Sequence, residues 1–255
     1  MSDHASEHAH GWEISPWPLP LSIGILFLVP LAFSFHFVYN METATVLSLG
    51  LGTVLTVMSI IGWISEAVED KYGWGNGWGL TAMPFFIVAE AFIFIAGFAT
   101  YWVMRLKAPS WPPAGTPEHM PFMIPIIMTI ILVSSSFTIH FAEARLDKHD
   151  VAGFRIWLII TIILGALFLG ISMNEWSTLM HEGFNVTTNS YSTAFFAITG
   201  LHASHVIVGL GIFIFILIPA LGGKADETLV KGGSMYWHFV DIVWFFVVSQ
   251  IYFWK

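Results

Sequence analysis

The segment Trp237-His238-Phe239-Val240-Asp241-Ile242-Val243-Trp244 opens the last long apolar run of the chain. If this segment is helical, His238 and Asp241 lie three residues apart and share one face of the helix. An aspartate inside a hydrocarbon span is costly unless it is paired or faces protein. We therefore expect this helix to turn its ionisable face toward neighbouring helices. The pair then serves either as a lock between helices or as a carrier of protons.

The composition is that of an integral membrane protein. Of the 255 residues, 56% are hydrophobic and 10% are charged, and the mean hydropathy is +0.75. The absence of cysteine excludes disulfides and a cysteine nucleophile. A net charge of −8 argues against a nucleic-acid partner, whose phosphates require a basic face. Residues 1–18 lack the basic and apolar parts of a cleavable signal peptide, so we expect the first span to direct insertion.

The hydropathy pattern predicts an all-α membrane protein with seven transmembrane helices. Each apolar run is long enough to cross about 30 Å of hydrocarbon at about 1.5 Å per residue. The expected spans are residues 19–39, 44–65, 79–104, 121–141, 156–173, 191–218 and 235–254. The short link between the first two spans predicts an antiparallel hairpin over 19–65, preceded by a polar arm, residues 1–18, and kinked at Pro30.

The connections between the spans carry most of the charge. Residues 66–78 are acidic and rich in glycine and tryptophan, which predicts an interfacial loop. Charged loops are expected at 144–155 and between the last two spans, and Glu175 is expected at the membrane surface after the fifth span. With the N-terminus inside, the inner segments hold six of the nine lysines and arginines, which favours that orientation.

Glu90 is the single charged residue of the third span, about eleven residues and thus roughly 17 Å from its start. Our hypothesis is that Glu90 pairs with His202 or His205 of the sixth span, or is protonated. The alternative roles are an interhelical hydrogen bond and a place in a proton path, and we favour the hydrogen bond.

Histidines form two further candidate sites. His202 and His205 share a helix face and could ligate a metal or haem, but the small residues around them favour plain helix packing. His4, His8 and His10 lie on the polar arm and titrate near neutrality. They are a candidate proton antenna, although histidines in a tail are more often simply solvated.

Several motifs resemble subunit III of the haem-copper terminal oxidases, and together they extend over nearly the whole chain. The longest are Phe195-x-x-x-Thr199-Gly200-x-His202-x-x-His205-Val206 and Tyr236-Trp237-His238-Phe239-Val240-Asp241-x-Val243-Trp244. The others are Ser15-Pro16-Trp17-Pro18-Leu19, the lone Glu90, and Leu164-Gly165-x-x-Phe168 followed by Glu175. The resemblance thus includes the residues that we expect to be buried polar groups of the family motif: Glu90, Glu175, His202, His205, His238 and Asp241.

The resemblance implies two N-terminal helices separated by a lipid-holding cleft from a five-helix bundle, residues 79–255. It implies that this chain binds no redox cofactor, and that haems and copper reside in the partner subunits I and II of the oxidase. The implied role is to sustain proton uptake and to protect the catalytic subunit while oxygen is reduced to water. Structural phospholipid is also implied. Trp63 is a candidate lipid contact, although acidic residues follow it where the family usually has arginines.

Two other functions remain open at this point. A stand-alone proton-coupled transporter would line a path with Glu90, the histidines and Asp241, but no pair of broken helices indicates an inverted repeat. A subunit III-like protein associated with nitric-oxide reductase would share the fold and differ in its partner. We expect a cytochrome c oxidase rather than a quinol oxidase, in a bacterial plasma membrane rather than a mitochondrial one.

Overall fold

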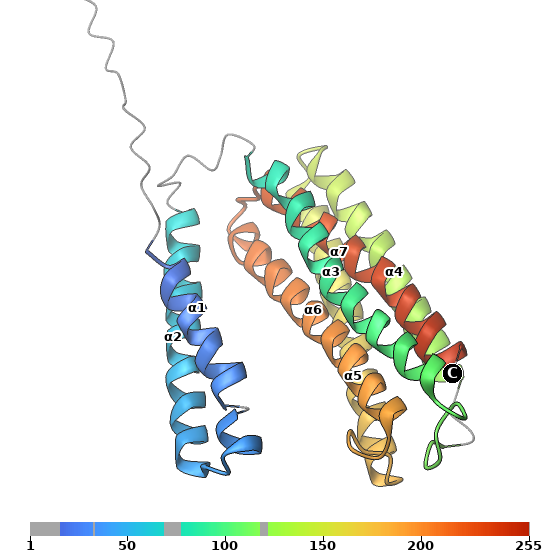
Figure 1. Ribbon diagram of the computed structural model, residues 1–255. Helices are drawn as coiled ribbons and strands as arrows, with labels where there is room; N and C mark the ends of the chain where they lie inside the picture. Colours follow the sequence, from blue (N-terminus) through green and yellow to red (C-terminus); the bar gives the residue numbers. More distant parts are fainter. Residues whose placement is uncertain (1–15, 33, 69–77, 118–121, 255) are drawn as a thin grey trace, which may run out of the picture. The chain divides into compact units, whose positions relative to one another are not determined.

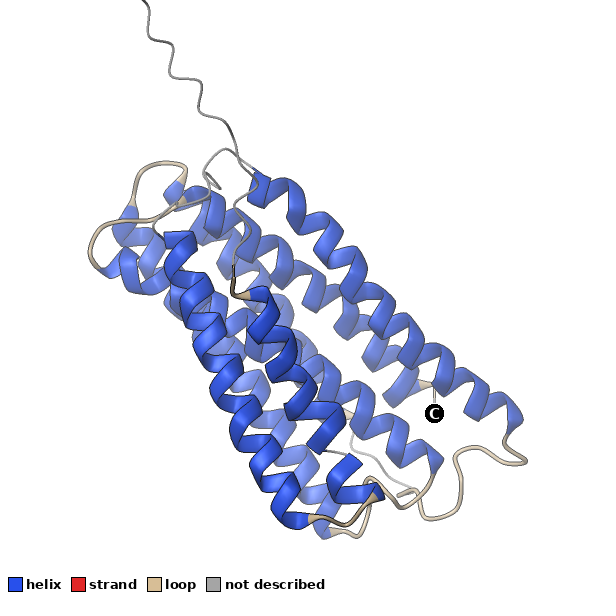
Figure 2. Ribbon diagram, turned by 60° about the vertical axis from the view of Figure 1, so that its left-hand side comes forward, coloured by secondary structure: helices blue, strands red, loops and turns tan. Residues whose placement is uncertain are grey.

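The computed structural model describes residues 16–32, 34–68, 78–117 and 122–254. In these ranges all regular structure is helical (Figure 2). Contacts divide the chain into two units, Met1–Asn76 and Gly77–Lys255, which are described separately below. The all-helical class predicted from the sequence is confirmed.

The first unit pairs a broken helical segment with one long helix (Figure 1). The broken segment consists of α1 (Pro18–Leu26) and two π-helical turns, η1 (Phe27–Leu31) and η2 (Ser34–Val38), and it packs against α2 (Glu42–Val68). Pro30 has no N–H to donate to the preceding turn, which explains why regular α-helix ends before it. Ser48 of α2 donates a hydrogen bond of 2.7 Å to the carbonyl of Phe27 and so satisfies a group in this irregular stretch.

The second unit contains five long helices and a short π-helical end (Figure 1). The helices are α3 (Trp78–Lys107), α4 (Met123–Leu146), α5 (Val151–His181), α6 (Ser190–Leu221) and α7 (Glu227–Val247), and η4 (Val248–Phe253) continues α7. α7 packs against α3, α4 and α6. Of the most apolar stretch of α7 and η4, 61% is buried, against 11% to 39% in the other long spans, so α7 is the central helix.

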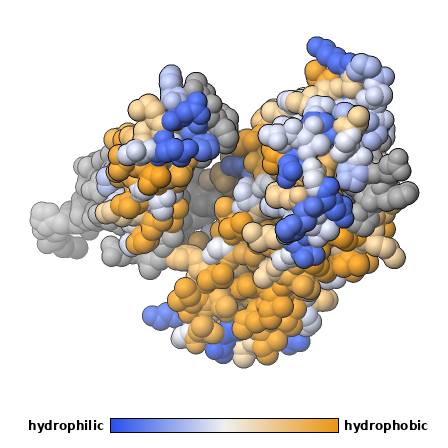
Figure 3. All heavy atoms as spheres, turned by 90° about the horizontal axis from the view of Figure 1, so that it is seen from below, coloured by the Kyte–Doolittle hydropathy of each residue, from blue (hydrophilic) through white to orange (hydrophobic). Residues whose placement is uncertain are grey.

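The outer surface of the second unit is apolar, as a lipid-facing surface must be. Figure 3 shows broad areas of hydrophobic side chains on this unit. Phe85 and Leu106, for example, are 76% and 81% exposed. Six helices of the described ranges are long and apolar enough to cross a membrane. The broken segment 18–38, where the sequence predicts a seventh span, is not among these six.

Several predicted helix ends are wrong by one or two turns because charged residues cap helices instead of forming loops. Asp150 accepts a hydrogen bond from the Gly153 N–H (2.8 Å) and starts α5. Asp226 accepts from the N–H groups of Thr228 and Leu229 and starts α7 eight residues before the predicted residue 235. The predicted charged loop 144–155 is therefore a short turn between Leu146 and Val151.

Candidate functional site

The tryptophan that precedes His238 fixes the position of α7 in the bundle. The ring of Trp237 is fully buried and lies against Gly165 of α5 and Gly209 of α6. A Cβ atom at either glycine would come within 2.7 Å of this ring. The indole Nε1 donates a 2.9 Å hydrogen bond to Ser135 Oγ of α4. One side chain thus contacts three neighbouring helices and orients the face that carries the ionisable residues.

His238 and Asp241 meet through a serine of α4. Ser136 Oγ is hydrogen bonded to Asp241 Oδ2 and lies 3.3 Å from His238 Nδ1. Asp241 is 5% exposed, and its second oxygen, Oδ1, is buried without a hydrogen-bond partner among the described residues. The sequence predicted a pair within α7. In the structure the two groups form a three-member cluster with Ser136, which we call the α4–α7 relay cluster.

Glu90 of α3 pairs with His205 of α6. The Glu90 Oε2 atom lies 2.9 Å from His205 Nε2, and both side chains are mostly buried. His205 Nδ1 lies 2.8 Å from the carbonyl oxygen of Leu201, which can only accept, so Nδ1 carries a hydrogen. One further proton is then shared between Nε2 and the carboxyl group. The Glu90–His205 contact therefore gives each side chain a hydrogen-bond partner and links α3 to α6.

His202 does not share this arrangement. Its side chain is 1% exposed, and neither ring nitrogen has a hydrogen-bond partner among the described residues. The ring lies between Trp244, with centroids 5.0 Å apart, and Phe168, with centroids 5.6 Å apart. Since His205 is occupied by Glu90, the two histidines do not present a pair of free ligands. The structure places His202 in aromatic packing.

Glu175 is buried and lies within α5, whereas the predicted fifth span ended before it at residue 173. It is 4% exposed, and α5 continues six residues beyond it to His181. Tyr252 of η4 donates a 2.7 Å hydrogen bond to Glu175 Oε2. Tyr101 and Tyr191 donate to carbonyl groups of Gln250 and Ile251. Three tyrosine hydroxyls thus hold the π-helical end of the chain, where the widened turn leaves carbonyl groups free.

The remaining candidate residues cannot be placed. His4, His8 and His10 lie outside the described residues, as does the side chain of Trp63, whose backbone belongs to α2. Within the described ranges, no three histidine or acidic side chains converge in a way that would hold a metal ion.

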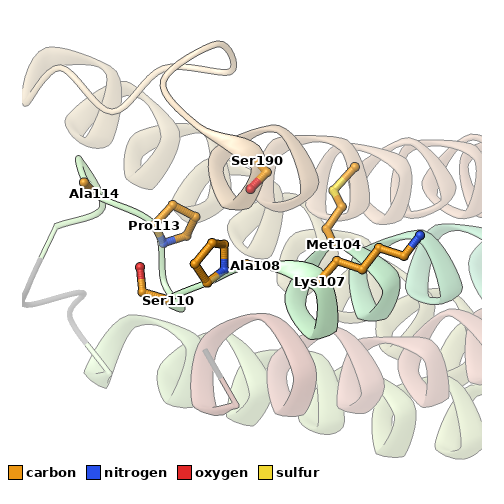
Figure 4. A pocket seen from close by; sticks show the side chains of 8 residues that line it. Met104, Lys107, Ala108, Ser110, Pro113, Ala114 and Ser190 are labelled. Atoms are coloured by element: carbon orange, nitrogen blue, oxygen red, sulfur yellow. The ribbon is translucent and has the colours of Figure 1, made fainter.

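A shallow hollow lies at the end of the second unit where α3 ends (Figure 4). The end of α3, the following loop and the first residue of α6 line it, with Lys107, Ser110 and Ser190 as the polar side chains. None of the predicted site residues contributes to this hollow.

Comparison with known proteins identifies the family. A family model described as cytochrome c oxidase subunit III matches residues 8–255. The chain belongs to the cytochrome c oxidase subunit III family. A cytochrome c oxidase subunit 3 of Synechocystis sp. is 36% identical over 171 residues, which are 66% of this chain and 72% of that protein. Subunits of the same name from Allomyces macrogynus (31% identity, 96% and 92% covered) and Drosophila melanogaster (28% identity, 100% and 99% covered) match almost end to end.

Membership of the subunit III family confirms the resemblance seen in the sequence motifs. Together with the six long apolar helices, it makes the chain a multi-pass membrane protein. The family relates the chain to an oxidoreductase complex of respiration.

Sequence reasoning missed two partners of the buried acids. Ser136 belongs to the triplet Ser134-Ser135-Ser136, whose small hydroxyl side chains are typical of close, hydrogen-bonded helix contacts but do not indicate which residue they bond. Tyr252 lies 77 residues from Glu175 and has no motif that marks it as a partner. No sequence pattern links these residues to the acids they contact. Such partners can be identified only once the packing of the helices is known.

Proposed function

We propose that this chain is the non-redox subunit III of a proton-pumping haem-copper oxidase, more specifically a cytochrome c oxidase. In this role it works beside subunits I and II, which hold the haems and copper, and it sustains proton uptake and the stability of the catalytic subunit during oxygen reduction. The observation that carries the proposal is the match of residues 8–255 to the subunit III family.

The arrangement of the buried polar groups supports an accessory role. Glu90 is bonded to His205, Glu175 to Tyr252, and Asp241 to Ser136. Each contact joins two helices of the second unit. A continuous transmembrane path would need these groups to be linked to one another, whereas among the described residues the three contacts share no member. This favours the accessory subunit over a stand-alone transporter.

The location and orientation belong to the same proposal. We place the N-terminus inside, since six of nine basic residues then lie in inner segments, and we favour a bacterial plasma membrane. Two N-terminal helices separated by a lipid-filled cleft from the five-helix bundle complete the expected seven-helix subunit. Trp63 as a lipid contact and His4, His8 and His10 as a proton antenna remain proposals.

The role can be tested by comparing the oxidase with and without this chain. We expect the depleted complex to begin oxygen consumption at a rate similar to that of the intact complex and to lose activity after far fewer turnovers. The physical reason is that slower proton delivery prolongs reactive intermediates in the partner. The measurement is oxygen consumption followed to inactivation, with re-addition of the chain as the control. An unchanged turnover lifetime would contradict the proposed role.

The same experiment with the Glu90→Gln variant distinguishes the two roles considered for Glu90, an interhelical hydrogen bond and proton transfer. Glutamine keeps the side-chain volume and can donate a hydrogen bond to His205 Nε2, but it cannot release a proton. Because we interpret the pair as an interhelical contact, we expect this variant to assemble and to keep the turnover lifetime. A shortened lifetime in a normally assembled complex would instead give Glu90 a role in proton transfer.

A further inference from the structure

The α4–α7 relay cluster lies at the buried end of a row of polar side chains, here called the polar seam, between the antiparallel helices α4 and α7. On α4 the seam consists of Ser136, His140, Glu143 and Asp147, and on α7 it consists of Lys231, Ser234, His238 and Asp241. The spacings of three and four residues place each set on one helix face. α4 and α7 pack against each other, so the two sets face one another along the contact.

The seam begins at the charged end of the second unit. There Lys231 Nζ lies 3.7 Å from Asp147 Oδ1 and 3.8 Å from Glu227 Oε2, and all three side chains are about half exposed. One turn further along, Glu143 neighbours Ser234 and His140. His140 is exposed, and His238, which neighbours it, is half-buried. Titratable groups therefore follow one another from the aqueous end to the relay cluster.

If Asp241 were ionised, one of its two carboxylate oxygens would be buried without a hydrogen bond from the described residues. A buried carboxylate oxygen without a hydrogen bond costs several kcal/mol, and Oδ1 has no partner among the described residues. The neutral acid avoids most of this cost. The histidine and acidic side chains on the helices packed against α7 are His140 and Glu143 of α4, Glu90 of α3, and His202 and His205 of α6, of which Glu90 and His205 are bonded to each other. None of them supplies a hydrogen bond to Oδ1.

Ser136 can connect this acid to the histidine. Its hydroxyl oxygen contacts both Asp241 Oδ2 and His238 Nδ1, and it has a single hydrogen to donate. In one arrangement the acid donates to Oγ, and Oγ donates to the neutral Nδ1. If Oγ passes its proton to Nδ1 while accepting the proton of Oδ2, the result is a carboxylate, an unchanged serine and an imidazolium. No proton is gained or lost, and the hydrogen bonds reverse direction.

We propose that Asp241, Ser136 and His238 form a proton relay that connects a buried proton-binding site in the middle of α7 with the aqueous phase at the charged end of the bundle. The relay loads and unloads one proton, and His238 exchanges it with water. Nothing in this proposal requires electron transfer, so it is testable in the resting complex independently of the role proposed for the chain in turnover.

The test is infrared spectroscopy of the intact complex after transfer from H2O to D2O. We expect the spectrum of the unmodified complex minus that of Asp241→Asn to contain a carboxylic-acid carbonyl band that shifts on deuteration. In Ser136→Ala the band should remain and its exchange should slow by about a hundredfold, the low end of what a positioned proton-transfer group contributes. Ser134→Ala is the matched control, because the hydrogen bond of Ser134 among the described residues goes to the carbonyl of Ile130 on its own helix.

Two outcomes would overturn the relay. One is the absence of a carboxylic-acid band attributable to Asp241 anywhere between about pH 5 and about pH 8, the range in which proteins tend to be most stable. The other is equally fast exchange in Ser136→Ala and in Ser134→Ala. Should Asp241→Asn fail to assemble, Asp241→Glu identifies the band by its shift, and the comparison of the two serine variants still decides the proposal.

Discussion

Replacing Gly165 with leucine is expected to prevent the five-helix unit from folding normally. The Cβ atom alone would lie 2.7 Å from both the Trp237 ring and the Leu210 side chain. Overpacking in a well-packed core costs about 1–3 kcal/mol, and here the buried ring that would have to move is held by α4, α5 and α6. We expect a loss at or above the upper end of that range. The measurement is the amount of monodisperse complex recovered from membranes and its midpoint of thermal denaturation.

The control for this substitution lies on the same helix. Gly170 has open space around its Cβ position, so Gly170→Leu should leave recovery and the thermal midpoint nearly unchanged. Gly209→Leu should behave as Gly165→Leu does, because its Cβ atom also meets the Trp237 ring at 2.7 Å. Equal behaviour of Gly165→Leu and Gly170→Leu would show that Trp237 is not the fixed centre of the bundle.

Replacing Gly52 with valine is expected to separate the helices of the first unit. A Cβ atom at this position would lie 2.7 Å from the backbone nitrogen of Leu28 and 2.9 Å from the carbonyl oxygen of Gly24. Backbone atoms cannot move aside as a side-chain end can, and small residues at such contacts let helices approach closely in membranes. We expect a loss of about 3 kcal/mol or more from overpacking without relief.

The comparison variant is Gly50→Val, since Gly50 has no neighbour within 4 Å of its Cβ position. Both variants replace glycine with valine within α2, so the change in intrinsic helix propensity is the same. The difference in stability between them therefore reports the contact alone. Limited proteolysis of the chain in membranes measures it. We expect rapid cleavage in Gly52→Val and slow cleavage in Gly50→Val. Similar cleavage rates would contradict the close crossing of α1 and α2.

The sequence predicted the helices well and their ends less well, for a physical reason. Length and hydropathy alone identify α2 to α7, because each must satisfy its backbone inside hydrocarbon. The ends depend on hydrogen bonds of single side chains, and Asp150 and Asp226 look like loop residues until the N–H groups they accept from are in place. Pro30 was expected to bend one helix, and the structure instead has α1 followed by two π-helical turns.

The candidate site was predictable as a set of residues but not as a set of contacts. Glu90 and His205 stand out in sequence because each is polar within an apolar run, and the structure joins them. The choice of His205 over His202 depends on which way each ring faces across α6. Asp241 was recognised as a buried acid, whereas Ser136 was not recognised as its partner. Its role depends on the register of α4 against α7, which no local pattern encodes.

The most direct test of the account is the fate of the chain during gentle purification. We expect an affinity-tagged chain to comigrate on a native gel with a band that stains for haem and consumes oxygen. Once dissociated from that band, the chain should show no haem absorption of its own, because its buried histidines and acids are bonded or packed between its helices. A haem spectrum retained by the separated chain, or proton transport by the chain alone in liposomes, would contradict it.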